Sequence, residues 1–339
     1  MRSPASPLKR PQPALVALVA AASLVLAGCG GDATGKDEPS TTPPELEAEK
    51  PNGQPADPDT WPLTGTTVAD DDSSGRNHPV LVLKMDNTAS SAPQVGLGSA
   101  DLVVEELVEG GMTRLAAFYY SEVPGDVGPV RSMRASDIGI VSPVEADVVT
   151  SGAAGVTISR IEDAGIDYVA EGGPGFYRDS GRRAPYNLFT DLEDVAKAAK
   201  QKIGRPDDYL PWGDASDLPS GQPATSIAAS FGGHVTNWSF RDDGYVNENS
   251  YAGDGDEFPA DTVLVLQVQV GDAGYRDPAG NPVPETKFIG TGEAMLFHDG
   301  RLVRGRWSKK ALDSAISLST QAGELTVPAG RTWIELVPA

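Results

Sequence analysis

Short apolar runs, separated by glycine and polar turn residues, dominate the chain from residue 79 onward. Runs of this length are typical of buried strands. We therefore expect strands over residues 80–85, 102–108, 112–120, 146–151 and 168–169. The second and third runs flank Glu109-Gly110-Gly111, which predicts a hairpin. The first run ends in Asp86-Asn87, so this strand should deliver an acid to a loop.

The same region contains three helical patterns. Residues 132–140 are expected to form a helix with Ser132 as its N-cap, and residues 157–164 a second, short helix. Residues 191–203 are amphipathic, with acids at the start and lysines at the end, as the helix macrodipole favours. Strands mixed with helices of these lengths predict an α/β sandwich over residues 77–205.

Residues 226–339 alternate between short apolar and polar runs, with Asp-Gly turns at 243–244 and 299–300. This pattern predicts a smaller, β-rich C-terminal domain. The preceding stretch is rich in proline and small polar residues, so we expect a linker over 206–225. The predicted fold class is α+β, an N-terminal α/β sandwich domain followed by the β-rich domain.

Residues 1–29 have the composition of a lipoprotein signal peptide. A positive start precedes an apolar run over 14–26, which is too short to span a membrane. Leu26-Ala27-Gly28-Cys29 then matches the bacterial lipobox. We expect Cys29, the only cysteine, to carry the acyl chains that hold the protein on the outer face of the bacterial cytoplasmic membrane. The alternative is an ordinary secretory signal with a chance cysteine.

The acidic, proline-rich composition of residues 30–76 predicts a disordered tether. The whole chain is also acidic, with 27 Lys and Arg against 48 Asp and Glu. This balance argues against nucleic acid as a partner and makes clusters of basic residues more informative.

Several motifs occur in an order that resembles a known family. They are MDN at 85–87, GGMTR at 110–114, VGPVRSMR at 127–134, GFYRDSGRRAPYNLF at 175–189, and GRWSKK with PAGRTWIELVP between 305 and 338. From Trp61 to the C-terminus, the chain resembles the YerB-like lipoproteins, whose N- and C-terminal domains are described as domain of unknown function 3048. The resemblance implies a lipoprotein with two such domains and no settled activity.

Basic residues gather at two places in the N-terminal domain. Two arginines flank the predicted helix start at Ser132, where free N–H groups and guanidinium groups both favour an anion. The loop 178–187 is either a basic lip over that anion or an exposed loop with solvated charges. The candidate ligand-binding residues are Arg114, Arg131, Arg134, Arg178, Arg183 and Asn187.

Acidic residues lie beside these arginines in the sequence. Asp86, Glu105 and Asp137 are candidates for an acid/base pair or a divalent-metal site. Strand alternation places Glu105 and Glu106 on opposite faces, so only one of them can face a given pocket. The alternative is that the acids and arginines form structural ion pairs.

The chain lacks a Gly-x-Ser-x-Gly elbow, and its three histidines are far apart in the sequence. We therefore favour a non-enzymatic role, in which an arginine-lined cleft binds an anionic envelope ligand or a cell-wall assembly partner. One alternative is an enzyme acting on phosphorylated wall-polymer or lipid-linked intermediates. Only that alternative requires a cofactor, Mg²⁺. A second alternative is a solute-binding lipoprotein, which predicts two similar α/β lobes.

Overall fold

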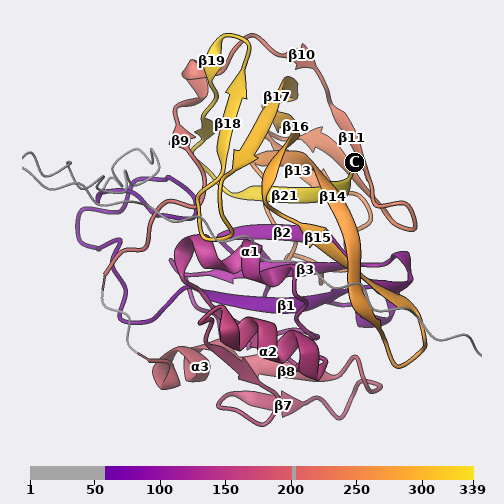
Figure 1. Cartoon of the computed structure of the whole chain (residues 1–339). Coiled ribbons are helices and arrows are strands. Elements are labelled where there is room, and N and C mark those ends of the chain that lie inside the picture. The colour runs from indigo at the N-terminus through magenta and orange to yellow at the C-terminus, as the bar shows by residue number, and fades with distance from the viewer. Residues whose placement is uncertain (1–57, 201–203) are drawn as a thin grey trace, which may run out of the picture. The chain divides into compact units, whose positions relative to one another are not determined.

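The apolar runs assemble into one long sheet, shown in Figure 1 for a computed structural model that describes residues 58–200 and 204–339. Its strands lie in the order β19-β18-β17-β16-β14-β21-β2-β3-β1-β5-β6, with β10 beside β17 and β15 beside β14. The N-terminal part contributes β1 (Leu81–Asn87), β2 (Leu102–Leu107), β3 (Thr113–Tyr119), β5 (Asp147–Thr150) and β6 (Tyr168–Ala170). The remaining strands are β10 (Gln222–Pro223), β14 (Thr262–Arg276), β15 (Pro282–Lys287), β16 (Gly290–His298), β17 (Arg301–Lys309), β18 (Ser317–Thr320), β19 (Gly323–Glu324) and β21 (Thr332–Pro338).

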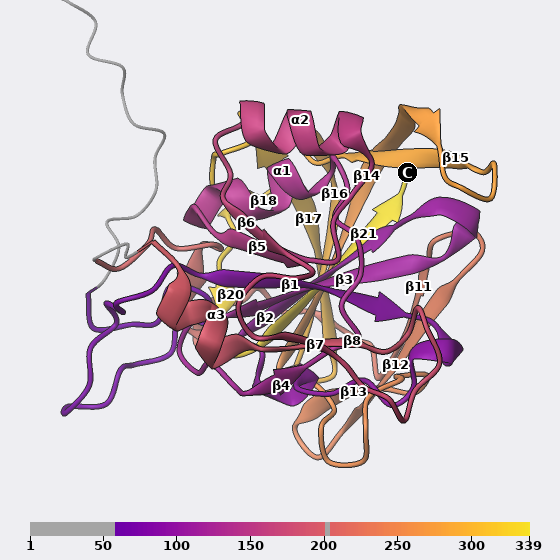
Figure 2. The same ribbon diagram turned by 90° about the horizontal axis from the view of Figure 1, so that it is seen from below.

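The sheet is covered on both faces, which explains the near-continuous apolar runs of its central strands. Figure 2 shows α1 (Asp137–Val141) and α2 (Gly155–Asp163) on one face. The opposite face carries two small sheets and α3 (Leu192–Ala198). These small sheets are β11 (Ser226–Ser230), β12 (Val235–Arg241) and β13 (Gly244–Asn247), and β4 (Asp126–Val127), β8 (Leu188–Asp191) and β7 (Phe176–Arg178). Two hydrophobic cores follow, one on each face of the sheet.

The described residues also form five short 3-10 turns. They are η1 (Ala89–Ser91), η2 (Leu97–Ser99), η3 (Glu109–Gly111), η4 (Ser142–Val144) and η5 (Ala215–Asp217). No helix in residues 58–200 and 204–339 is long and apolar enough to cross a membrane.

A parallel pairing of β2 with β21 joins the two halves of the sequence within the sheet. The stretch predicted as a linker, 206–225, lies against this structure: β9 (Trp212–Gly213) pairs with β20 (Val327–Pro328), β10 pairs with β17, and Tyr209 and Leu210 are buried. The described residues form one compact unit. Residues 77–205 and 226–339 are therefore not separate bodies joined by a free linker over 206–225.

The predicted end of the tether at residue 76 is wrong, because the last part of 30–76 is folded onto the domain. Leu63 is buried in the core beside α1 and α2, and the Arg76 guanidinium lies over the Trp61 ring at 4.4 Å. Apolar side chains within the polar stretch are enough to fold its last part onto the domain. The signal peptide and Cys29 lie outside the described residues.

The strand predictions are confirmed by β1, the β2–β3 hairpin, β5 and β6. The α/β sandwich expected over 77–205 is not clearly formed, since strands far outnumber helices. The helix expected over 132–140 forms only in its last part: α1 begins at Asp137 with Ser136 as its N-cap, so the predicted start at Ser132 is wrong. The backbone there is already used in strand-like bonds: Arg131 N donates to Lys84 O at 2.7 Å, and Met133 N to Gly152 O at 3.1 Å.

The hairpin of β14 and β15 forms an arm that reaches over the N-terminal part of the sheet (Figure 1). Three contacts hold it there. Arg160 of α2 pairs with Glu285 at 2.6 Å, Thr157 Oγ1 lies 3.0 Å from the Tyr275 hydroxyl, and Thr286 N donates to Ser136 Oγ at 3.0 Å. The tip of the arm, residues 277–279, lines a cleft.

Candidate functional site

This cleft has a volume of about 250 Å³ and lies where β1 ends and β3 begins. The hairpin turn between β2 and β3 and the tip of the arm form its walls. Its lining residues are Asp86, Thr88, Val108, Glu109, Met112, Thr113, Arg114, Arg131, Tyr186, Asp277, Pro278 and Ala279.

Strand register sets the charged row at the base of the cleft. Asp86 of β1 is the partner of Arg114 of β3, and Arg114 is the partner of Glu106 of β2. Directly opposed residues of antiparallel strands point to the same face, so the three charges lie side by side. Glu105 points to the other face, as the alternation predicted.

Arg131 is held in place on two sides. Its Nε lies 2.8 Å from Asp86 Oδ2, and its guanidinium lies over the Tyr186 ring with 5.3 Å to the centroid. A quarter of the Arg131 side chain remains exposed, whereas Asp86 is buried. The ion pair and the ring thus present Arg131 at the wall of the cleft.

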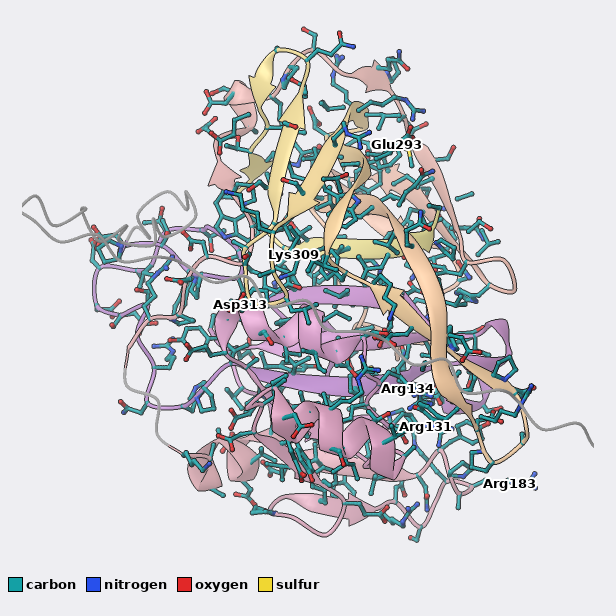
Figure 3. All side chains as sticks on the ribbon, viewed as in Figure 1. Arg131, Arg134, Arg183, Glu293, Lys309 and Asp313 are labelled. Carbon is teal, nitrogen blue, oxygen red and sulfur yellow. The ribbon has the colours of Figure 1, made fainter. Side chains whose placement is uncertain are left out.

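Arg134 pairs with Glu109, with Nε donating to Oε2 at 3.0 Å and Nη2 to Oε1. Burial raises the pKa of the Glu109 carboxyl, but the hydrogen bonds and charge of Arg134 outweigh burial, so the pKa is lowered overall. Glu109 is therefore ionised at neutral pH and neutralises Arg134. Figure 3 shows Arg131 and Arg134 close together and Arg183 further toward the edge of the molecule.

Lys84 forms a buried charge cluster behind the cleft. Its Nζ lies 2.6 Å from Asp137 Oδ1 and 2.9 Å from Glu106 Oε1, and all three side chains are fully buried. The cross-strand partner of Lys84 is the small Ala116, which leaves room for the long side chain. Burial raises the pKa of Glu106, and the nearby Lys84 charge only partly opposes this effect.

Arg114 differs from the other cations of the site. It is 4% exposed, and its Nη1 donates to the carbonyl of Ser132 at 2.8 Å, but within the described part of the chain it has no carboxylate ion pair. Its Nε is buried and lacks a hydrogen-bond partner there. Burial lowers the pKa of Arg114 to about 10, helped by the charges of Arg134 and Arg131 and opposed by the more distant carboxylates of Glu109 and Asp86. Arg114 remains a cation at neutral pH, with unused donor capacity beside the cleft.

On the opposite face of the sheet, Glu105 and Glu335 are neighbours in register on β2 and β21. Glu105 accepts hydrogen bonds from Asn87 Nδ2 and Thr236 Oγ1, both at 3.0 Å, and Glu335 from Trp238 Nε1 at 2.8 Å. Burial and the adjacent Glu105 raise the pKa of Glu335 well above its usual range. The two carboxyls fasten β12 to the central sheet, away from the cleft.

The loop residues have separate positions. Arg178 pairs with Glu171 at 2.7 Å and donates to Asn187 Oδ1 at 2.7 Å, and Arg183 is exposed. The cleft lining includes none of Arg178, Arg183 and Asn187, although it includes Tyr186 of the same loop. Arg182 fixes the loop by donating to the carbonyls of Ser91 and Pro93.

The candidate acids do not gather into a metal site. Asp86 is paired with Arg131, Asp137 with Lys84, and Glu105 faces the other side of the sheet. Across residues 58–200 and 204–339, no group of three or more His, Cys, Asp or Glu side chains is placed to hold a metal ion.

A larger hollow of about 420 Å³ lies elsewhere, beside His78, Tyr120 and Arg205. Arg205 there is occupied by Asp208, through Nη2, and by the carbonyl of Thr60. The other charged residues that line this hollow include Glu145, Asp207 and Asp313, which are acids. Among the described residues, its lining therefore offers no free cation to an anion. The smaller cleft is therefore the better candidate site.

Sequence reasoning missed Lys84, Glu109 and the arm tip. Lys84 could have been recognised, because a lysine inside an apolar strand needs a buried partner for its charge. Glu109 was assigned only to a turn. The arm tip carries no local signal, because it reaches the cleft only through the length of β14 and its docking on α2.

Comparisons with known proteins agree with this architecture. Residues 63–206 match the family model described as the N-terminal domain of a protein of unknown function, DUF3048, and residues 228–334 match the corresponding C-terminal domain. A Bacillus subtilis (strain 168) protein titled "Putative lipoprotein YerB" is 26% identical over 289 residues, which are 82% of this chain and 86% of that protein.

The crystal structure of YerB from Bacillus subtilis has the same fold, with a TM-score of 0.68 and 20% identity over 83% of this chain and 97% of that one. The two family matches together cover most of the chain and lie on either side of residues 207–227. The chain belongs to the DUF3048 family and contains both its N- and C-terminal domains.

Proposed function

We propose that this protein is a lipid-anchored lipoprotein of the bacterial envelope that binds an anionic envelope ligand through the arginine-lined cleft. The lipobox at Leu26–Cys29 supports the anchor, and a relative titled as a lipoprotein agrees with it. The acyl chains on Cys29 would hold the protein at the outer face of the cytoplasmic membrane. The ligand would be free, or displayed by a partner in wall assembly.

One observation carries the binding proposal: Arg114 is buried beside the cleft without a carboxylate partner in the described residues. A buried guanidinium is costly unless its charge and donors are satisfied. The neighbouring cations each have a carboxylate within ion-pair distance, so a ligand oxyanion is the natural partner for Arg114.

The contacts of the acids weigh against the enzymatic alternative. Its Mg²⁺ would need Asp86 or Asp137, and both carboxylates are already bound to cations. The solute-binding alternative predicted two similar α/β lobes, whereas both halves of the described chain contribute strands to the same large sheet.

The test is Arg114→Lys, which keeps the charge but loses the planar fork of donors. Binding to a soluble fraction of enzymatically digested cell wall is measured for wild type, for this variant and for Arg183→Lys as a matched control on the exposed loop. We expect Arg114→Lys to weaken binding about tenfold or more and Arg183→Lys to leave it unchanged. Equal affinities for all three proteins, or no binding by wild type, would contradict the proposal.

A further inference from the structure

The charges around the cleft also restrict the charge of its ligand. Three carboxylates line the cleft together with only two guanidinium groups: Asp86, Glu109 and Asp277 against Arg114 and Arg131. Arg131 is paired with Asp86, and Glu109 with Arg134. One cation of the lining, Arg114, is left for a ligand.

The third carboxylate lies on the tip of the arm. Asp277 accepts hydrogen bonds from Asn281 N at 2.7 Å and from Asn281 Nδ2 at 3.0 Å. The side-chain hydrogen bond to Asn281 lowers the pKa of Asp277, so it is ionised at neutral pH. Asp277 lines the same cleft as Arg114, so its negative charge repels a second negative charge brought there.

The remaining walls are apolar. Val108, Met112, Pro278 and Ala279 line the cleft, and Met112 is 42% exposed. An aliphatic group attached to the anion would cover these side chains and remove them from water.

We infer that the cleft selects a singly charged oxyanion on an aliphatic stem, a carboxylate or a phosphodiester, and discriminates against a phosphate dianion. This inference rests on the proposed anion site and adds the charge of the ligand. Arg114 neutralises one negative charge, and the carboxylate of Asp277 disfavours a second.

The test compares matched probes by calorimetry on the full chain in detergent at pH 8. Butyl methyl phosphate and hexanoate carry one charge, whereas butyl phosphate carries two at this pH because its second ionisation has a pKa of about 6. We expect the two monoanions to bind about tenfold more tightly than the dianion. Binding of only one monoanion would identify the source as carboxylate or diester, and either result supports the inference. Tighter or equal binding of butyl phosphate would overturn it.

Two further measurements separate the charge effect from changes in the fold. At pH 5 butyl phosphate is a monoanion, so its affinity should approach that of butyl methyl phosphate. The charge of butyl methyl phosphate is the same at both pH values, so a change in its affinity would report a change in the protein. Asp277→Asn should tighten butyl phosphate binding several-fold and hexanoate binding by a smaller factor, because a dianion feels about twice the repulsion of a monoanion. Asp272→Asn, on the same arm but outside the cleft lining, is the control. Equal effects of the two variants, or an unchanged preference at pH 5, would refute the role of charge.

Failure of this inference can be told apart from failure of the proposed function. If no oxyanion binds and Arg114→Lys has no effect, the anion site itself is wrong. If oxyanions bind through Arg114 but the dianion is preferred, only the charge selection is wrong.

Discussion

The pair formed by Glu105 and Glu335 shows how single residues fasten the two halves of the sheet. The carboxyls lie on neighbouring parallel strands and receive donors from β1 and β12. Two buried carboxyls so close cannot both ionise without strong repulsion. The folded state therefore favours a proton on the pair, and Glu335 has the raised pKa.

This pair predicts a stability that falls as pH rises. The folded-state pKa of Glu335 lies above its unfolded value, so its contribution is fully present below the unfolded pKa and is lost as pH rises through the folded pKa. Between pH 5 and pH 8, the free energy of unfolding should drop by up to about 1.4 kcal/mol per pH unit from this group. Urea unfolding at both pH values measures the drop.

Glu335→Gln removes the titrating group and should flatten this pH dependence. Glu293→Gln, at an exposed position of β16, should leave the dependence as in wild type. An equal slope in Glu335→Gln and wild type would show that the pair does not hold a proton.

At the residue scale, the sequence predicted some of the charged residues at the cleft, such as Asp86, Arg114 and Arg131, but neither Lys84 and Glu109 nor the pairing of the charges. Arginines among buried-strand acids indicated either ion pairs or a site; the structure contains ion pairs, and the ligand site at Arg114 is a proposal. Asp86 pairs with Arg131, yet Asp137 goes to Lys84, and Arg134 takes Glu109. These choices depend on strand register and on the small size of Ala116, neither of which local spacing reveals.

At the element scale, buried strands were predictable because short, continuous apolar runs between turn residues are typical of strands that are covered on both faces. The helix expected at Ser132 failed because tertiary bonds at 131 and 133 took precedence over local capping preference. The sequence predicted strands in this region, but it did not predict that β14 and β15 form an arm over the N-terminal part of the sheet. The docking of this arm includes the ion pair of Arg160 with Glu285, which are far apart in the sequence.

The arm should loosen when its ion pair is removed. Arg160→Met breaks the contact with Glu285 but leaves the cores intact, so we expect a stability loss of only about 0.2–1 kcal/mol. Hydrogen exchange of residues 276–284 should become faster, while exchange in β1 to β3 stays unchanged. Arg304→Met on β17 is the control, since Arg304 is exposed and β17 pairs with neither strand of the arm. Unchanged exchange in the arm would show that Arg160 does not hold it.

At the scale of the whole molecule, the shared sheet revises the expectation that a cut near Pro219 gives two separate domains. Pro219 is exposed, so a protease site inserted there should be cleaved. Because β2 and β21 pair through the middle of the sheet, we expect the two fragments to remain associated and to elute together in gel filtration. Separation into two folded fragments without denaturant would contradict this expectation.

The anchor is predicted to depend on one atom of the chain, Cys29 Sγ. Cys29→Ala should leave the folded unit unchanged but release the protein from membranes, because the acyl chains supply the attachment. Membrane fractionation at high salt measures the release, with Cys29→Ser as a second variant lacking the thiol. Full retention of both variants would place the anchor elsewhere.

The central claim is that Arg114 holds a ligand oxyanion, and the most direct measurement is the NMR signal of its side-chain Nε–H group. Arg114 Nε is buried without a partner in the described residues, so a bound carboxylate should change its environment more than that of any exposed arginine. Titration with hexanoate should shift the Arg114 Nε–H signal with a saturable curve, assigned by its loss in Arg114→Lys, while the Arg183 signal stays in place. Saturable binding of hexanoate with an unmoved Arg114 signal would contradict the account.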